Sequence, residues 1–222
     1  MAHMVDVEGL VAMKKEHPGA AIVSYVNTTA ETKAVSDYCC TSANAVKVIK
    51  AIDENEVIFV PDMNLGQYVQ RFTEKKIHLW PGYCPTHNNN ITLDAITKKK
   101  ELHPDAMILV HPECKPEVID IADFVGSTEA ILNFAKNSDH DRFIIGTEKD
   151  MCHRLSTYMP HKTFYPLEDA VCPNMKKITY EMFERALKSL QPEVHLSEDI
   201  MKKALIPLER MVEIGRGDKG QN

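Results

Sequence analysis

The sequence predicts an α/β protein with two similar domains, each a three-layer αβα unit built on a parallel sheet. Two observations lead to this prediction. Short β-branched runs alternate with helix-like stretches, and the connections between them are short, as in parallel sheets that carry helices on both faces. The pattern of the first half also recurs 86 residues later, for example from Pro18 to Pro104. This period suits duplication of a whole small domain better than a solenoid.

The first half begins with a helix at residues 5–17 and continues into a buried type of strand at residues 20–26. The rest of this half alternates in the same way, and hydroxyl or amide side chains are expected to cap its helices. The predicted elements are a helix from Thr29 to about residue 36, a strand at 37–41, a helix at 43–52 capped by Ser42, a strand at 57–60, a helix from Asn64 to about residue 72 and a strand at 76–80.

The second half repeats this order. Strands are expected at residues 106–110, 142–145 and 163–166, and two further helices follow at 179–190 and 197–214. We therefore expect domains at residues 5–96 and 97–176, followed by C-terminal helices within 177–222. Residues 1–4 are interpreted as a cloning remnant.

The composition argues against several functional classes. The chain has 222 residues, a net charge of −6 and 44% hydrophobic residues, which does not suit a general nucleic-acid surface. It has no apolar run of the roughly 18 residues that a membrane span needs, and the N-terminus lacks the apolar segment of a signal peptide. Six cysteines in this length do not suit a disulfide-rich secreted domain. We expect a cytoplasmic protein whose loop cysteines are metal ligands or reactive thiols.

Two cysteines lie in loops that follow predicted strands. Cys84 lies in a loop rich in Pro and Gly, and Cys172 takes the corresponding place in the second half. The carboxyl edge of an open parallel sheet is where ligands bind, so these thiols are placed for reactivity or metal ligation. A zinc site at Cys84 and His87 is an alternative, although the usual second pair of ligands is missing. Three other cysteines are expected to be buried structural thiols: Cys39, Cys40 and Cys152.

Polar side chains recur at the ends of the first strand of each half. An acid and an imidazole two positions apart on a strand, Glu113 and His111, lie on the same side, as acid–base chemistry requires. Tyr25 corresponds to His111, and it also fits the interpretation of a core tyrosine. Ser42 and Thr128 supply hydroxyls at a helix start, where free N–H groups bind carboxylate or phosphate, although N-capping alone would also explain them.

These segments together closely resemble the quinolinate synthase family, over nearly the whole chain. The resemblance rests on Ser24-Tyr25-Val26-Asn27-Thr28-Thr29-Ala30-Glu31, Thr41-Ser42-Ala43-Asn44-Ala45, His111-Pro112-Glu113-Cys114, Gly126-Ser127-Thr128 and the two cysteine loops. It implies a transferase of NAD biosynthesis that condenses iminosuccinate with dihydroxyacetone phosphate to quinolinate. It also implies three similar domains around a pseudo-threefold axis, with a [4Fe-4S] cluster held by one cysteine from each.

The resemblance assigns roles to residues of this chain. Cys84 and Cys172 match two of the three cluster ligands, and Glu113, His111 and Tyr25 match catalytic positions, with Glu113 as the preferred general base. The implied substrate-binding positions are Tyr25, Val26, Asn27, Ser42, His111, Pro112, Glu113 and Thr128.

The resemblance also implies partners outside this sequence. A first domain would carry the third cysteine, because two thiolates hold a cluster poorly, and an L-aspartate oxidase or dehydrogenase would supply iminosuccinate. No nucleic acid and no membrane are expected as partners. Two alternatives to the enzyme remain open: a two-domain relative that binds small anions without catalysis, and a metal or redox sensor that uses Cys84 and Cys172.

Overall fold

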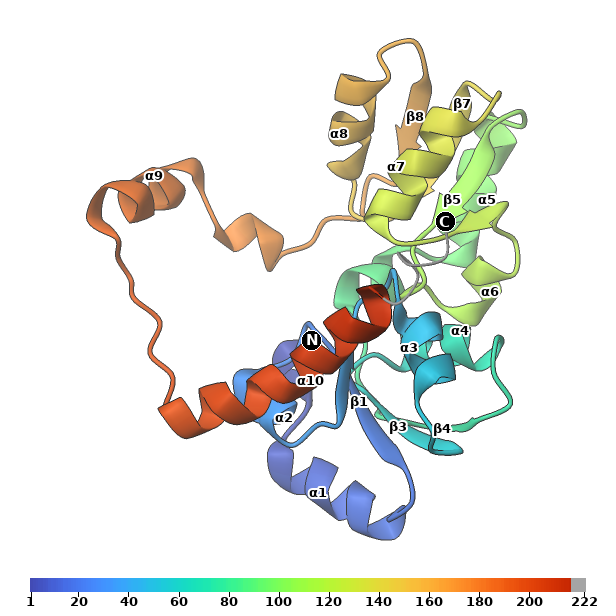
Figure 1. Cartoon of the computed structure of the whole chain (residues 1–222). Coiled ribbons are helices and arrows are strands. Elements are labelled where there is room, and N and C mark those ends of the chain that lie inside the picture. Colours follow the sequence, from blue (N-terminus) through green and yellow to red (C-terminus); the bar gives the residue numbers. More distant parts are fainter. Residues whose placement is uncertain (217–222) are drawn as a thin grey trace.

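The computed structural model describes residues 1–216 and contains two α/β domains with a C-terminal helical region (Figure 1). Residues 217–222, which belong to the expected C-terminal region, lie outside the described residues. Each domain has its own four-stranded parallel sheet, which confirms the predicted fold class.

The first domain follows a short 3-10 helix, η1 (Ala2–Met4), and alternates between helix and strand. Its elements are α1 (Val7–Glu16), β1 (Ala21–Tyr25), α2 (Ala30–Ala34), β2 (Tyr38–Cys40), α3 (Ala45–Ala51), β3 (Glu56–Val60), α4 (Met63–Gln70) and β4 (Lys76–Leu79).

A π-helical turn, η2 (Thr86–Asn90), leads into the second domain. The elements of that domain are α5 (Leu93–Leu102), β5 (Met107–Val110), α6 (Pro116–Ile119), β6 (Phe124–Val125), α7 (Thr128–Asn137), β7 (Arg142–Gly146), α8 (Met151–Tyr158) and β8 (Thr163–Pro166). The expected boundary between residues 96 and 97 falls inside α5, which packs on β7.

The two sheets have equivalent strand orders, β2-β1-β3-β4 and β6-β5-β7-β8. The pairing of β1 with β3 and that of β5 with β7 have the same register when 86 is added to each residue number. A carboxylate at the start of the second strand is repeated as well. Asp37 Oδ2 accepts the Ile22 N–H at 2.8 Å, and Asp123 Oδ2 accepts the Ile108 N–H at 2.7 Å. The repeat in the sequence therefore corresponds to a repeat in backbone pairing.

Both sheets are buried on their two faces, as expected for parallel sheets covered by helices. In the first domain, Phe59 and Val57 face one apolar cluster while Ile58 and Val60 face another. Alternate residues of a strand point to opposite faces, so a continuous apolar run such as Val57–Val60 fills both clusters. This arrangement places the polar chemistry at the strand ends.

Two helix caps differ from the prediction. The α4 helix is capped by Asp62, whose Oδ1 accepts the Leu65 N–H at 2.8 Å, and Asn64 lies inside the helix. The α3 helix begins at Ala45 after Asn44, so Ser42 does not cap it. In both places the chain enters the helix at a position other than the polar residue chosen from the sequence.

The C-terminal region contains a 3-10 turn, η3 (Met175–Lys177), and the two predicted helices, α9 (Tyr180–Ser189) and α10 (Glu198–Arg216). The α10 helix packs against α2, β2 and α3 of the first domain. The α9 helix lies on a segment that extends away from both domains (Figure 1), and its Phe183 and Leu187 are exposed.

Within residues 1–216, no helix combines the length and the apolar character that crossing a membrane would require.

Candidate functional site

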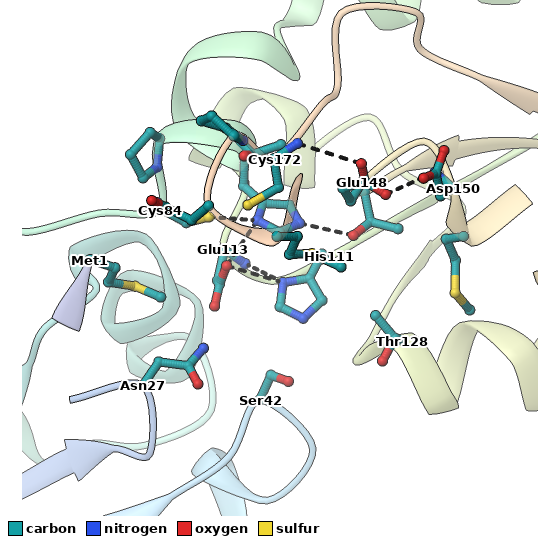
Figure 2. Close-up of a pocket in the computed structure, with 18 of the residues that line it drawn as sticks. Met1, Asn27, Ser42, Cys84, His111, Glu113, Thr128, Glu148, Asp150 and Cys172 are labelled. Atoms are coloured by element: carbon teal, nitrogen blue, oxygen red, sulfur yellow. Dashed lines mark hydrogen bonds and ion pairs between the residues drawn. The ribbon is translucent and has the colours of Figure 1, made fainter. Parts of the chain in front are cut away.

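The strand-end loops of the two domains enclose one cavity of about 740 Å³ (Figure 2). Its walls come from both domains and from the two cysteine loops. The residues that the sequence singled out and that line it are Tyr25, Asn27, Ser42, Cys84, His111, Glu113, Thr128 and Cys172.

The first domain contributes Tyr25, Asn27 and Ser42 to the cavity. Tyr25 is the last residue of β1 and is 7% exposed. Burial raises the pKa of its hydroxyl, and the neighbouring Glu113 carboxylate raises it further. The phenol therefore keeps its proton at neutral pH and can donate it in a hydrogen bond.

The second domain contributes His111, Glu113 and Thr128. The α7 helix is capped by Ser127, whose Oγ accepts the Ala130 N–H at 3.2 Å, and Thr128 is the first helical residue. The interpretation of Ser42 and Thr128 as N-caps is therefore wrong for both. Their hydroxyls line the cavity at a helix start and a turn, where they can donate to an anion.

Glu113 forms a buried ion pair with His87, which the sequence did not assign to catalysis. His87 Nδ1 lies 2.8 Å from Glu113 Oε2, and the two residues are 8% and 3% exposed. Burial alone would raise the pKa of Glu113, but the hydrogen bond with His87 holds it well below its usual range. Burial opposes the charge on His87 as well, yet its hydrogen bonds with Cys84 and Glu113 raise its pKa. The pair is imidazolium and carboxylate.

His111 is neutral beside this pair. Burial and the positive charge of His87 lower its pKa, and the two rings stack with centroids 4.6 Å apart. The Glu113 backbone N–H donates to His111 Nδ1 at 3.3 Å, which assigns the ring proton to Nε2. His111 is thus a neutral hydrogen-bond donor at the cavity wall.

Cys84 and Cys172 line the cavity and are half-buried. The other four cysteines are buried, which confirms the structural prediction for Cys39, Cys40 and Cys152. Cys114 is also buried, and burial raises its pKa. The two loop cysteines are therefore the ones available to an incoming ligand.

Each loop cysteine is fixed by a carboxylate from the end of the third strand of its domain. Asp62 Oδ2 accepts the Cys84 N–H at 2.9 Å, and Glu148 Oε1 accepts the Cys172 N–H at 3.5 Å. Asp62 and Glu148 are 86 positions apart. A side chain at Gly82 would collide with the Pro61 carbonyl oxygen, so Gly82 lets the Cys84 loop approach this strand end.

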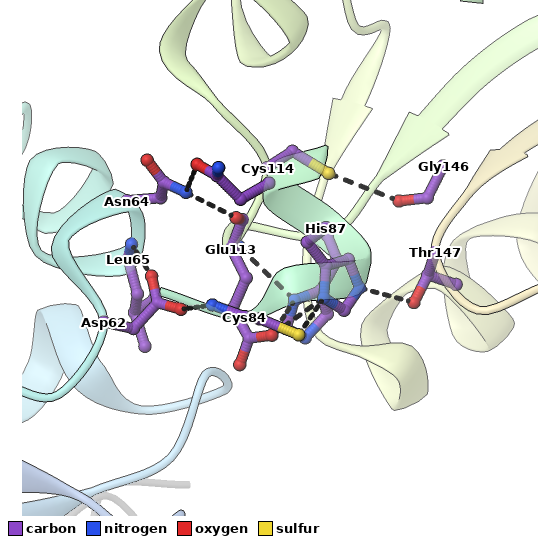
Figure 3. A network of polar contacts seen from close by, with 11 residues as sticks. Asp62, Asn64, Leu65, Cys84, His87, Glu113, Cys114, Gly146 and Thr147 are labelled. Atoms are coloured by element: carbon purple, nitrogen blue, oxygen red, sulfur yellow. Dashed lines mark hydrogen bonds and ion pairs between the residues drawn. The ribbon is translucent and has the colours of Figure 1, made fainter. Parts of the chain in front are cut away.

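A buried polar network joins the Cys84 loop to the second domain (Figure 3). His87 Nδ1 lies 3.2 Å from Cys84 Sγ, and His87 Nε2 lies 2.9 Å from Thr147 Oγ1. Asn64 Nδ2 donates to Asn88 Oδ1 at 3.0 Å and to the Glu113 carbonyl oxygen at 3.1 Å. These contacts hold the two halves of the cavity in one geometry.

The network also bears on the zinc alternative. Cys84, His87 and Glu113 bring one sulfur, one nitrogen and one oxygen within 4.8 Å of one another. His87 would have to lose its Nδ1 proton to bind a metal there, and that proton now serves Cys84 and Glu113. The zinc site at Cys84 and His87 stays an alternative, and Glu113 offers a third ligand atom to it.

Two predicted substrate-binding residues, Val26 and Pro112, are not among those that line the cavity. Val26 packs against the core of the first domain, and its N–H donates to the Cys40 carbonyl oxygen at 2.9 Å. Each lies in the sequence between two residues that do line the cavity. A prediction made from whole sequence segments therefore included them.

Sequence reasoning missed Asp62 and Glu148 as parts of the site, and it considered His87 only as a zinc ligand beside Cys84. The 86-residue repeat contained a signal for Asp62 and Glu148, because both acids follow the third strand of their domain. No signal in the sequence pairs His87 with Glu113, which lies 26 positions away.

The N-terminal residues also reach the cavity. Met1 and His3 line it, and Trp80 Nε1 donates to the Met4 carbonyl oxygen at 2.7 Å. The interpretation of residues 1–4 as a cloning remnant stays a prediction. These residues nevertheless contact the first domain.

Comparison with known proteins identifies the family of the chain. The family model for Quinolinate synthetase A protein matches residues 1–213. The quinolinate synthase of Methanoregula boonei is 49% identical over 96% of this chain and 70% of its own length. The enzymes of Geotalea uraniireducens and Clostridium acetobutylicum are 48% and 45% identical, each over 97% of this chain and 71% and 72% of their own lengths. This chain therefore belongs to the quinolinate synthase family.

Proposed function

We propose that the cavity between the two domains is where iminosuccinate and dihydroxyacetone phosphate condense to quinolinate. The observation that carries this proposal is that one cavity combines two half-buried thiols with polar side chains from both domains. The family has its role in NAD biosynthesis, and both proposed substrates are small anions. The proposal assigns binding chiefly to the first domain and proton transfer chiefly to the second.

Substrate anions would be held by neutral donors. The Asn27 amide and the hydroxyls of Ser42 and Thr128 line the cavity, and the hydroxyls are not used as helix caps. Hydroxyl and amide groups donate hydrogen bonds to carboxylate and phosphate oxygens. His111 Nε2–H adds a further neutral donor.

Proton transfer would use Tyr25, Glu113 and His111. Burial raises the pKa of Tyr25, so its hydroxyl stays protonated and would donate a hydrogen bond to a substrate oxygen that becomes negatively charged. The contact with His87 keeps Glu113 ionised, and we assign this carboxylate the role of proton acceptor. The reaction removes protons from carbon and delivers them to leaving hydroxyls, so it needs both kinds of group.

Cys84 and Cys172 fit two ligands of a [4Fe-4S] cluster. Both cysteines line the cavity, their backbone N–H groups donate to Asp62 and Glu148, and His87 Nδ1 lies 3.2 Å from Cys84 Sγ. When bound by three thiolates, such a cluster supplies an open iron that polarises a substrate oxygen. Among the described residues, the remaining cysteines are buried, so the third thiolate is proposed to come from a first domain.

The proposal extends to partners and location. A first domain would close the cavity, and an L-aspartate oxidase or dehydrogenase would supply iminosuccinate. A cytoplasmic location suits free cysteines that must stay reduced to bind iron.

Anaerobic reconstitution tests the proposal. This chain alone should give little or labile absorbance at about 400 nm, the signature expected of a [4Fe-4S] chromophore. Adding the first domain of the Methanoregula boonei relative should raise that absorbance and yield quinolinate from the two substrates. Robust four-iron incorporation by this chain alone would contradict the ligand assignment, and a complete cluster without quinolinate would favour a non-catalytic anion-binding protein.

Cysteine variants provide the matched control. In the completed protein, Cys84→Ala and Cys172→Ala should each lose the cluster. Cys152→Ala should retain it, because Cys152 is buried in the second domain and does not line the cavity. Equal cluster loss in all three variants would point to general destabilisation.

A further inference from the structure

A group of side chains that could hold a metal ion lies outside the cavity, toward the opposite ends of the strands of the first sheet. His17 follows α1 and precedes β1, Glu56 begins β3, and His78 lies in β4. They belong to the side of the domain where strands β1 and β3 begin, whereas the cavity lies where strands end. One nitrogen or oxygen atom from each of the three residues lies within 4.8 Å of the others.

The contacts among the three residues are close. His78 Nε2 lies 2.7 Å from Glu56 Oε2, and the two side chains are 10% and 43% exposed. The rings of His17 and His78 stack with centroids 3.5 Å apart. The hydrogen bond with His78 lowers the pKa of Glu56. Two imidazoles and an ionised carboxylate are thus gathered at a surface that solvent ions can reach.

The second domain shows which part of this arrangement belongs to the fold. His103, 86 positions after His17, stacks on Tyr165 with ring centroids 3.5 Å apart. Tyr165 pairs with Ile144 as His78 pairs with Ile58. The stack of a histidine on a ring of the fourth strand is therefore a packing feature common to both domains.

Of the two domains, the first alone has this set of two histidines and one carboxylate. At the strand position of Glu56 the second domain has Arg142, which forms an ion pair with Asp105 at 2.6 Å. Tyrosine in place of His78 and arginine in place of Glu56 remove two of three ligands. Packing explains the stack, but it does not require a histidine and a carboxylate at these two positions.

We propose that His17, Glu56 and His78 bind a divalent transition-metal ion of the Zn²⁺ type, at a site separate from the cavity. Two imidazole nitrogens and one carboxylate oxygen are a common ligand set for Zn²⁺, with water completing the coordination. The rings must open from their stack so that both lone pairs face the ion, and the half-exposed Glu56 has room to follow. The bound ion would fasten the turn after α1 to the edge strand β4.

Zinc binding to the Cys84→Ser/Cys172→Ser double variant of the full chain tests this proposal, because the two thiols of the cavity are then removed. Equilibrium dialysis with Zn²⁺ should give one bound ion per chain. In the imidazole NMR spectrum, the resonances of His17 and His78 should shift while those of His103 stay in place. A titration in which His17 and His78 do not shift would overturn the proposal.

Further substitutions in the same background supply the controls. His78→Tyr reproduces the histidine–tyrosine stack of the second domain, and it should weaken Zn²⁺ binding about 10-fold or more, at least as much as the loss of an outer-shell partner. Glu56→Gln changes a half-exposed side chain, so the fold should persist. This variant should also weaken Zn²⁺ binding. His103→Asn should bind Zn²⁺ as the parent does. Unchanged affinity in both His78→Tyr and Glu56→Gln would refute the site.

Discussion

The two domains share a backbone plan but differ in the chemistry at their sheet edges. Strand order, register and the carboxylate that fixes each loop cysteine are repeated. The first domain ends β1 with Tyr25 and Asn27, while the second has His111 and Glu113 at the matching positions. The same apolar strands maintain the scaffold in both domains, whereas the side chains at the strand ends, although buried as well, differ in chemistry between the domains.

The two domains also differ at the residue that follows the third strand by four positions, Asn64 in the first domain and Asp150 in the second. In the first domain, Asn64 is buried and donates to groups near the domain boundary. Its counterpart in the second domain, Asp150, is an exposed partner of Lys176. Asn64 therefore contributes to the boundary, and its counterpart Asp150 does not make these contacts.

The largest expected effect comes from breaking the ion pair that joins the domains. His87→Leu leaves the Glu113 carboxylate buried without its partner, and removing one member of a buried pair costs about 3–5 kcal/mol of unfolding free energy. Urea unfolding measures this. His103→Leu, which removes a stacked ring but no ion pair, is the control. Losses of equal size in the two variants would mean that packing accounts for the effect of His87.

The division of labour between the domains predicts different kinetic defects. In the protein completed with a first domain, Glu113→Gln should retain the cluster and substrate binding yet lower turnover by about 10²-fold or more, the usual scale for a lost acid–base group. Asn27→Ala should mainly raise the substrate concentration needed for half-maximal rate. Steady-state quinolinate formation separates the two. Near-normal turnover of Glu113→Gln would show that Glu113 does not transfer the proton, and His111 would be the next candidate.

The boundary network predicts an intermediate effect. Asn64→Ala leaves the Glu113 carbonyl oxygen and the Asn88 amide oxygen without their donor, at a cost of about 1–3 kcal/mol. Asp150→Ala removes only an exposed ion pair, worth about 0–1 kcal/mol. Thermal or urea unfolding of both variants compares equivalent positions of the two domains. A larger loss for Asp150→Ala would reverse the assignment of the boundary contacts to the first domain.

Per pH unit, the smallest effect is a pH dependence centred on Asp62. Burial, with the nearby Glu113 charge, raises the pKa of Asp62 from 3.8 to about 7. The folded protein therefore holds a proton that the unfolded chain releases between pH 4 and 7, so Asp62 contributes less stability as pH rises. Relative to the parent, Asp62→Asn should gain up to about 1.4 kcal/mol per pH unit across this window. Urea titrations at several pH values measure the difference, and a constant difference would contradict the shift.

Much of the architecture followed from local sequence signals. Apolar runs of strand length, bounded by Gly, Pro and polar residues, gave both sheets, and the 86-residue repeat matched their register. The cavity residues Tyr25, Asn27 and Glu113 were found because strand ends of a parallel sheet meet at one edge. Burial of the cysteines in strands and helices was predicted for the same local reason, since an interior strand position is buried on either face.

Other features depended on where the folded chain brings distant groups. The caps of α3 and α4 were misplaced because capping depends on the residue at which the backbone turns into the helix, and several neighbouring polar residues could serve. The charge states of His87 and Glu113 depend on a 2.8 Å contact between residues of different domains, and spacing along the sequence cannot encode it. The sequence alone determined the scaffold, since burial patterns are local. Only the tertiary structure decided the electrostatics of the site, because desolvation and charge pairing exist only once the two domains have met.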